Sequence, residues 1–220
     1  MGIQESVIAL RKKLDEIDRR VQIVAATKTR TIDEIRQCMD TGLCLAAGEN
    51  RVQELREKFV PDFRWDFIGQ LQTNKVKYVV GKATLIHSLD RPELAAAIEK
   101  EAQKHDLIQD VLIQINSGNE ETKAGIELSR TDAFLRELSA YKHIRVCGLM
   151  AVAPLFFTEE QLRETFSAVH AVFKEREDEV FRYLSMGMSN DCFIAAECGA
   201  NIVRVGRAIF GERQYNEKLC

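Results

Sequence analysis

The chain has 220 residues, of which 45% are hydrophobic and 30% are charged. This composition is typical of a soluble globular domain that is long enough to bury a core. Lys and Arg (31) nearly balance Asp and Glu (34), and the formal net charge of -3 argues against bulk binding to nucleic acid or to an anionic membrane. No stretch reaches the roughly 20 apolar residues of a spanning helix, and the charged start of the chain lacks the apolar core of a signal peptide. We therefore expect one cytoplasmic domain over residues 1–220.

The six cysteines and four histidines follow no pattern that indicates a metal site or a disulfide framework. No Cys-x-x-Cys pair occurs, and the histidines are scattered along the chain. In a chain that is expected to be cytoplasmic, such cysteines are typically reduced thiols. The sequence therefore predicts no bound metal.

A first helix is predicted because apolar residues recur at helical spacing from Val7 to Ile17. After it, short apolar runs alternate with longer helical patterns to the end of the chain. The helical patterns carry their own signals, such as the capping box Thr31-x-x-Glu34 and a proline in a first turn at Pro92. The predicted strands are residues 21–26, 43–47, 65–68, 84–88, 110–115, 144–152, 182–186 and 202–205.

Eight buried strands that alternate with helices favour a closed parallel (β/α)8 barrel of the TIM type with an extra N-terminal helix. The alternative is an open doubly wound sheet. The eighth strand distinguishes the two folds, because only a closed barrel brings it beside the first strand. In a barrel the residues that follow each strand share one working face, and polar rim residues include Lys28 after the first strand and His87-Ser88 at the end of the fourth.

Lys28 follows an apolar strand, so its side chain is expected to point into the mouth of the barrel. A lysine that is partly desolvated there can offer a neutral amine for Schiff-base chemistry. The alternative is a lysine whose ammonium group snorkels to the surface.

Arg204 alternates with two valines on the eighth strand, so it is expected to point toward the barrel axis. An ion pair with Glu49 would be the alternative role for this arginine. The ends of strands seven and eight usually hold phosphate in such barrels. Here they offer Gly187, Ser189 as a helix N-cap, and the backbone amides of Gly206 and Arg207 at the start of another helix.

Ser189 has a simpler alternative role as a plain helix cap. Taken together, however, a phosphate site at strands seven and eight, Arg204 on strand eight and Lys28 on the adjacent strand one describe a slot for a phosphorylated aldehyde. Pyridoxal 5'-phosphate is such an aldehyde.

Six strings spread along the chain resemble the pyridoxal phosphate homeostasis protein family. They are TKT at 27–29, GENRVQE at 48–54, FIGQLQTNK at 67–75, GLM at 148–150, LSMGMS at 184–189 and VRVGRAIFG at 203–211. The resemblance is collinear and covers nearly the whole chain. It implies a single barrel of the alanine-racemase N-terminal type that holds pyridoxal phosphate as a reversible Schiff base.

The resemblance also implies a role for particular residues. Lys28 corresponds to the Schiff-base lysine and Arg204 to the partner of the pyridine nitrogen. Asn50 would lie beside the ring, and the phosphate would lie on Ser189 and the amides of Gly206 and Arg207. Asp66 stands where the family commonly has histidine, and residues 116–119 look like a variant of the fifth-strand loop. Since Asp66 lies within a strand, we do not expect it to touch the cofactor.

An arginine beside the pyridine nitrogen disfavours protonation of the ring, which makes the ring a poor electron sink. The related racemases also use a tyrosine from an additional domain, and none of Tyr78, Tyr141, Tyr183 and Tyr215 is expected to reach the slot. We therefore predict a carrier that buffers pyridoxal phosphate and passes it to apoenzymes. The alternatives are a racemase or lyase on the same barrel, and an aldolase that uses Lys28 without a coenzyme.

Two further expectations concern assembly and release. No sustained apolar surface stripe is evident in the sequence, which favours a monomer. Lys123, in the loop after strand five, is either a residue on an exit route for the cofactor or a solvated loop lysine.

Overall fold

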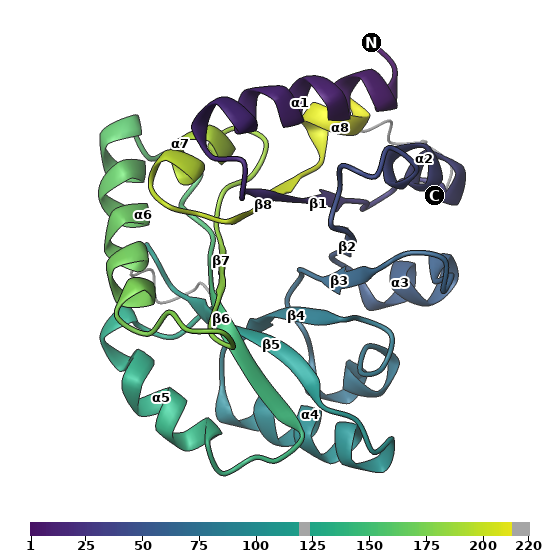
Figure 1. Ribbon diagram of the computed structural model, residues 1–220. Coiled ribbons are helices and arrows are strands. Elements are labelled where there is room, and N and C mark those ends of the chain that lie inside the picture. Colours follow the sequence, from purple (N-terminus) through teal and green to yellow (C-terminus); the bar gives the residue numbers. More distant parts are fainter. Residues whose placement is uncertain (119–123, 213–220) are drawn as a thin grey trace.

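Eight parallel strands close into a barrel in the computed structural model, which describes residues 1–118 and 124–212 (Figure 1). Strand β8 pairs with β1, with Arg204 opposite Val24. The predicted closed barrel is therefore confirmed, and the open sheet is excluded. Lys123 and Tyr215 lie outside the described residues. The strands are β1 (Gln22–Ala26), β2 (Ala46–Glu49), β3 (Trp65–Phe67), β4 (Leu85–Leu89), β5 (Gln109–Ile115), β6 (Ile144–Ala151), β7 (Tyr183–Ser185) and β8 (Ile202–Val205).

Helical segments connect the strands on the outside of the barrel (Figure 1). The capping box of Thr31 and Glu34 forms as predicted. The connection after β3 is a 3-10 helix, not an α-helix. The segments are α1 (Ile3–Ile17), α2 (Ile32–Met39), α3 (Val52–Lys58), η1 (Thr73–Tyr78), α4 (Pro92–Lys104), η2 (Leu128–Arg130), α5 (Thr131–Leu138), α6 (Glu159–Lys174), α7 (Cys192–Glu197) and α8 (Arg207–Phe210).

The N-terminal helix α1 covers the seam at which the barrel closes. It lies across β8 and β1 next to α8 (Figure 1). Its buried residues Leu10 and Leu14 join one apolar cluster with Ile23 of β1 and Val203 of β8. The extra helix therefore supports the two strands that carry the predicted lysine and arginine.

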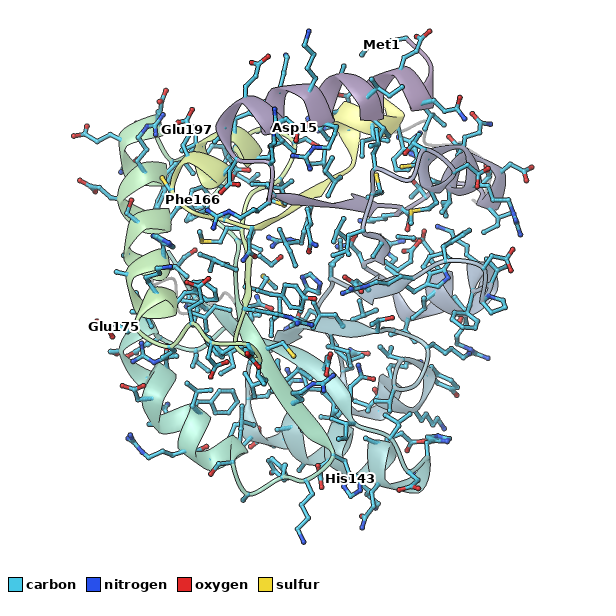
Figure 2. All side chains as sticks on the ribbon, viewed as in Figure 1. Met1, Asp15, His143, Phe166, Glu175 and Glu197 are labelled. Atoms are coloured by element: carbon cyan, nitrogen blue, oxygen red, sulfur yellow. The ribbon has the colours of Figure 1, made fainter. Side chains whose placement is uncertain are left out.

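Side chains fill the space inside and around the barrel (Figure 2). On α6, Phe166 is fully buried, whereas Glu175 after this helix and Glu197 on α7 are exposed at the periphery. Inside the barrel, the apolar side chains of one cluster share the interior with buried polar groups. The apolar cluster is Val24, Ala46, Ile68, Leu85, Leu112, Cys147, Met150 and Ile202, and the polar side chains are those of Asp66, His87, Ser185 and Arg204.

The cysteines of the described residues are free thiols. The closest pair, Cys38 and Cys44, is buried with its sulfur atoms 3.6 Å apart. Within residues 1–118 and 124–212, no group of three or more His, Cys, Asp or Glu side chains is arranged to hold a metal ion. In the same ranges, no helix combines the length and the apolar character that crossing a bilayer requires.

Candidate functional site

A cavity of about 820 Å³ opens at the C-terminal ends of the strands. This volume is within the range of small-molecule sites. Its apolar wall includes Ala26, Ile68 and Met150. The structure brings all six sequence-predicted residues to this cavity, which is lined by Lys28, Asn50, Ser189, Arg204, Gly206 and Arg207.

Lys28 lies in a strained turn just after β1. Its side chain is half-buried, and the next residue, Thr29, has a φ of +66°. A β-branched residue rarely adopts this left-handed conformation. The Thr29 N–H donates a 2.6 Å hydrogen bond to Glu54 Oε2, which helps to hold the turn in place. Strain that surrounding contacts maintain is common at functional sites.

A cluster of the buried Glu49 with the partly buried Lys58 and Glu54 holds the backbone around this turn. Lys58 Nζ lies 2.8 Å from Glu49 Oε1 and 2.7 Å from Glu54 Oε2, and it donates to the Thr27 carbonyl oxygen at 3.0 Å. Glu49 accepts hydrogen bonds from Thr27 Oγ1 at 2.7 Å and from the Asn50 N–H at 3.2 Å. The Glu49–Lys58–Glu54 cluster therefore fixes two loops that line the cavity.

The two carboxylates of this cluster respond differently to their surroundings. Burial raises the pKa of Glu49, and the hydrogen bond from Lys58 only partly opposes this effect. Burial also acts to raise the pKa of Glu54, but hydrogen bonds from Lys58 and Thr29 outweigh it and the pKa is lowered. Glu49 is therefore the carboxylate of the cluster that takes up a proton first on acidification.

Arg204 projects from β8 into the barrel, with 4% of its surface exposed. Its Nη1 donates to Ser185 O at 2.8 Å and to Ser185 Oγ at 2.7 Å, and its Nη2 donates to Ala151 O at 2.8 Å. Burial lowers the pKa of Arg204 to about 10, so the guanidinium stays protonated at neutral pH. The alternative ion pair with Glu49 is wrong, because Glu49 pairs with Lys58.

The Nε–H of Arg204 differs from the other two nitrogens of the guanidinium. It donates to no protein atom of the described residues, yet it is not among the fully buried unpaired atoms. Because Arg204 lines the cavity, this donor is left facing the cavity. It is available to a ligand acceptor.

Ser189 is not the N-cap that the sequence predicts. The N-cap of α7 is Asp191, whose Oδ1 accepts a 2.6 Å hydrogen bond from the Met188 N–H. This contact forms a turn ahead of the helix, so Ser189 lies outside it. The Ser189 hydroxyl instead accepts a 3.3 Å hydrogen bond from the Gly206 N–H and thereby links the loops after β7 and β8.

The loops after β7 and β8 provide several hydrogen-bond donors at the cavity. Arg207 is the first residue of α8, so its N–H has no intrahelical acceptor, and its exposed guanidinium donates to Asn190 Oδ1 at 2.8 Å. Helix α8 spans four residues, which is too short for a large macrodipole. An anion here would therefore be bound by amides, by the Ser189 hydroxyl and by Arg207 rather than by a helix dipole.

Two glycines allow close packing in the loops after β3 and β7. Gly187 has a φ of +88°, and an added Cβ would lie 2.7 Å from Ala195 Cβ. A Cβ on Gly69 would lie 2.0 Å from Asn50 O. Only glycine therefore lets the loop after β3 lie against Asn50.

The sequence assigns no role in the site to the polar residues beneath the cavity. His87, expected at the rim, lies inside β4 and is fully buried, as are Asp66 and Ser185. None of the three lines the cavity. Strand alternation could have indicated Asp66, because it lies between the outward-packing Trp65 and Phe67 and must therefore point inward.

Comparisons with known proteins place the chain in a family. The family described as alanine racemase, N-terminal domain, matches residues 8–214. The pyridoxal phosphate homeostasis protein of Aquifex aeolicus is 43% identical over 201 residues, which are 88% of this chain and 88% of that relative. The chain belongs to the pyridoxal phosphate homeostasis protein family. The resemblance inferred from the sequence motifs is therefore confirmed.

Solved structures agree with this membership. PipY of Synechococcus elongatus PCC7942, in its structure with PLP bound, is 30% identical with a TM-score of 0.84, and the match covers 96% of this chain and all of PipY. Alanine racemase from Corynebacterium glutamicum shares 14% identity with a TM-score of 0.70, over 96% of this chain and 62% of the racemase. At that identity the likeness concerns the fold alone.

Proposed function

We propose that this protein binds pyridoxal 5'-phosphate reversibly through Lys28 and buffers its concentration. The observation that supports this most strongly is that Lys28, just after β1, and Arg204, on the paired strand β8, line one cavity. When bound, the group supplies an aldehyde that an amine can capture as a Schiff base. A relative at 43% identity is named a pyridoxal phosphate homeostasis protein, and PipY has been solved with PLP bound.

The donors in the cavity fit this cofactor. Arg204 Nε–H would meet the pyridine nitrogen, which is an acceptor only while it is unprotonated. The Ser189 hydroxyl, the amides of Gly206 and Arg207 and the Arg207 guanidinium would bind the phosphate, and Asn50 would lie beside the ring. These groups all line the cavity, and charge-assisted hydrogen bonds are the strong ones for phosphate.

A role as a carrier fits the site better than catalysis. A cationic guanidinium keeps the ring nitrogen unprotonated, and this weakens the ring as an electron sink. Among the described residues no tyrosine lines the cavity, so a second acid or base of the kind that the racemase alternative requires is not found there. The fold that the chain shares with alanine racemases does not favour that alternative by itself.

We propose further that the protein is a cytoplasmic monomer that delivers the cofactor to apoenzymes. Leu155 and Phe156, in the loop after β6, are 77% and 94% exposed, and Leu155 lines the cavity. They offer an apolar contact to a recipient at the mouth. Light scattering of the purified protein tests the oligomeric state. A transfer assay with a pyridoxal phosphate-dependent apoenzyme tests delivery.

Titration of the cofactor-free protein with pyridoxal phosphate tests the proposed function. Wild type should develop the absorption band of a lysine Schiff base at one equivalent, and Lys28→Ala should not. Lys75→Ala is the matched control, because Lys75 is an exposed rim lysine that does not line the cavity. Equal binding by wild type and Lys28→Ala would overturn the proposal. Steady turnover of an amino acid that depends on Lys28 would favour the racemase or lyase instead.

A further inference from the structure

A row of hydrogen-bonded polar side chains, which we call the Arg64–Arg204 network, crosses the barrel beneath the cavity. It begins at Arg64, just before β3, and ends at Arg204 on β8. Asp66, His87 and Ser185 have no exposed surface, and they belong to β3, β4 and β7. The contacts are Arg64 Nε to Asp66 Oδ1 at 2.8 Å, Asp66 Oδ2 to His87 Nε2 at 3.3 Å, His87 Nδ1 to Ser185 Oγ at 3.0 Å and Ser185 Oγ to Arg204 Nη1 at 2.7 Å.

Arg64 and Arg204, at the two ends of the Arg64–Arg204 network, fix the direction of every hydrogen bond within it. Arg204 can only donate, so Ser185 Oγ accepts from it. Asp66 accepts two hydrogen bonds from Arg64, at 2.8 and 3.2 Å, which is the geometry of an ionised carboxylate with arginine. An ionised Asp66 can only accept, so the hydrogen lies on His87 Nε2. A neutral His87 then has a lone pair on Nδ1, and the Ser185 hydroxyl donates to it.

The charges around His87 favour its neutral form. Burial lowers the pKa of His87, and Arg204 and Arg64 act in the same direction, against Asp66. A protonated His87 would place a third cation between two arginines with one carboxylate to balance them. It would also leave the Ser185 hydroxyl hydrogen without the Nδ1 acceptor.

We propose that Asp66 and His87 are positioning residues that act through Ser185 to hold the Arg204 guanidinium with its Nε–H toward the cavity. The proposal rests on the proposed function, since Arg204 Nε–H is the group that would meet the ring nitrogen. The carbonyl oxygens of Ser185 and Ala151 hold two edges of the guanidinium. The hydroxyl of Ser185, oriented by His87, adds the contact that restricts its rotation. Asp66, which does not line the cavity, thus helps to orient the arginine without touching the cofactor.

Ser185→Ala tests the proposal, and the protein offers a matched control in Ser88. Ser88, next to His87, is also a buried strand serine, with 1% of its surface exposed, but its hydroxyl has no partner within residues 1–118 and 124–212. Each variant loses one buried hydroxyl. Only Ser185→Ala breaks the link between His87 and Arg204.

Ser185→Ala loaded with pyridoxal phosphate should show a shifted absorption maximum and release the cofactor about five-fold faster, the net scale of one ordinary hydrogen bond. Ser88→Ala should match wild type in both measurements. If wild type binds the cofactor and the two variants behave alike, the positioning role is overturned while the proposed function stands. If wild type does not bind it, the proposed function fails and this role toward the cofactor fails with it.

A measurement on the cofactor-free protein tests the hydrogen-bond directions independently of loading. Nitrogen-15 NMR of the imidazoles should show His87 of wild type neutral at pH 7 with its hydrogen on Nε2. The Nδ1 resonance should move in Ser185→Ala and not in Ser88→Ala. A hydrogen on Nδ1, or a protonated His87, would overturn the assignment, and wild type alone suffices for this result if a variant fails to fold.

Discussion

Two groups of buried and partly buried ions lie near the cavity, and they hold its two principal residues in different ways. The Glu49–Lys58–Glu54 cluster contacts the main chain, at the Thr27 carbonyl, the Thr29 N–H and the Asn50 N–H. It therefore fixes the path of the backbone that carries Lys28. The Arg64–Arg204 network runs through side chains and fixes the orientation of one guanidinium.

The two groups also carry opposite imbalances of charge. In the cluster Lys58 contacts both carboxylates, and the exposed Arg51 adds a longer contact, at 3.9 Å to Glu54. The Arg64–Arg204 network, in contrast, has two arginines for one carboxylate, Asp66. Burial accordingly raises the pKa of Glu49 and lowers that of His87. Acidification therefore favours the folded state through Glu49 of the cluster and disfavours it through His87 of the Arg64–Arg204 network. Stability and pH dependence can distinguish the two modes of support.

Removal of the cation from the cluster should have the largest effect on stability. Lys58→Met leaves the fully buried Glu49 without its cation, and we expect the free energy of unfolding at neutral pH to fall by about 3–5 kcal/mol. Urea unfolding measures this loss. The loss should shrink at acid pH, because a protonated Glu49 needs no cation. Lys75→Met, at an exposed site, is the control, and equal losses in both variants would contradict the role of the cluster.

The Arg64–Arg204 network should make the protein less stable at acid pH. The pKa of His87 is lowered in the folded state, so the unfolded chain binds the proton first. The free energy of unfolding should therefore fall as the pH drops below about 6.5, with a slope of at most about 1.4 kcal/mol per pH unit from this one group. Urea unfolding between pH 7.5 and 5 measures the slope. His87→Gln should lessen it, and an unchanged slope would show that His87 is not its source.

The phosphate end of the site should show a moderate effect on binding. Ser189→Ala removes a hydroxyl that lines the cavity, and we expect retention of pyridoxal phosphate to weaken by about 1 kcal/mol or somewhat more. Fluorescence or absorption titration measures the change. Ser117→Ala is the control, since its hydroxyl donates to Val152 O and does not line the cavity. Unaltered affinity in Ser189→Ala would show that the phosphate does not bind at Ser189.

The smallest expected effect tests whether Glu54 supports the turn through the Thr29 main chain alone or whether the Thr29 side chain is needed as well. Thr29→Gly keeps the N–H that Glu54 accepts and relieves the strained φ of +66°. We expect the protein to become more stable by up to about 1 kcal/mol and to bind the cofactor as before. Thermal unfolding measures the gain. A clear loss of stability or of binding would show that the threonine side chain is needed.

The closed barrel and the convergence of the six candidate residues on one cavity could be predicted from the sequence, because both depend on local patterns. Alternating strand and helix signals imply the fold, and residues at strand ends such as Lys28 and Arg204 must share the mouth. The parts that the sequence predicts poorly depend on contacts between distant segments. Ser189 precedes α7 because Asp191 binds Met188 N–H. His87 meets Ser185 across 98 positions of the chain, which no local pattern encodes.

Borohydride reduction of the protein loaded with pyridoxal phosphate, followed by mass mapping of the labelled peptide, identifies the amine that holds the cofactor. The Lys28 amine, just after β1, and the Arg204 guanidinium of β8 would face one bound cofactor. We expect a single label on Lys28, with loss of the absorption band on reduction. A label on another lysine, or no label on a protein that retains the cofactor, would contradict this arrangement.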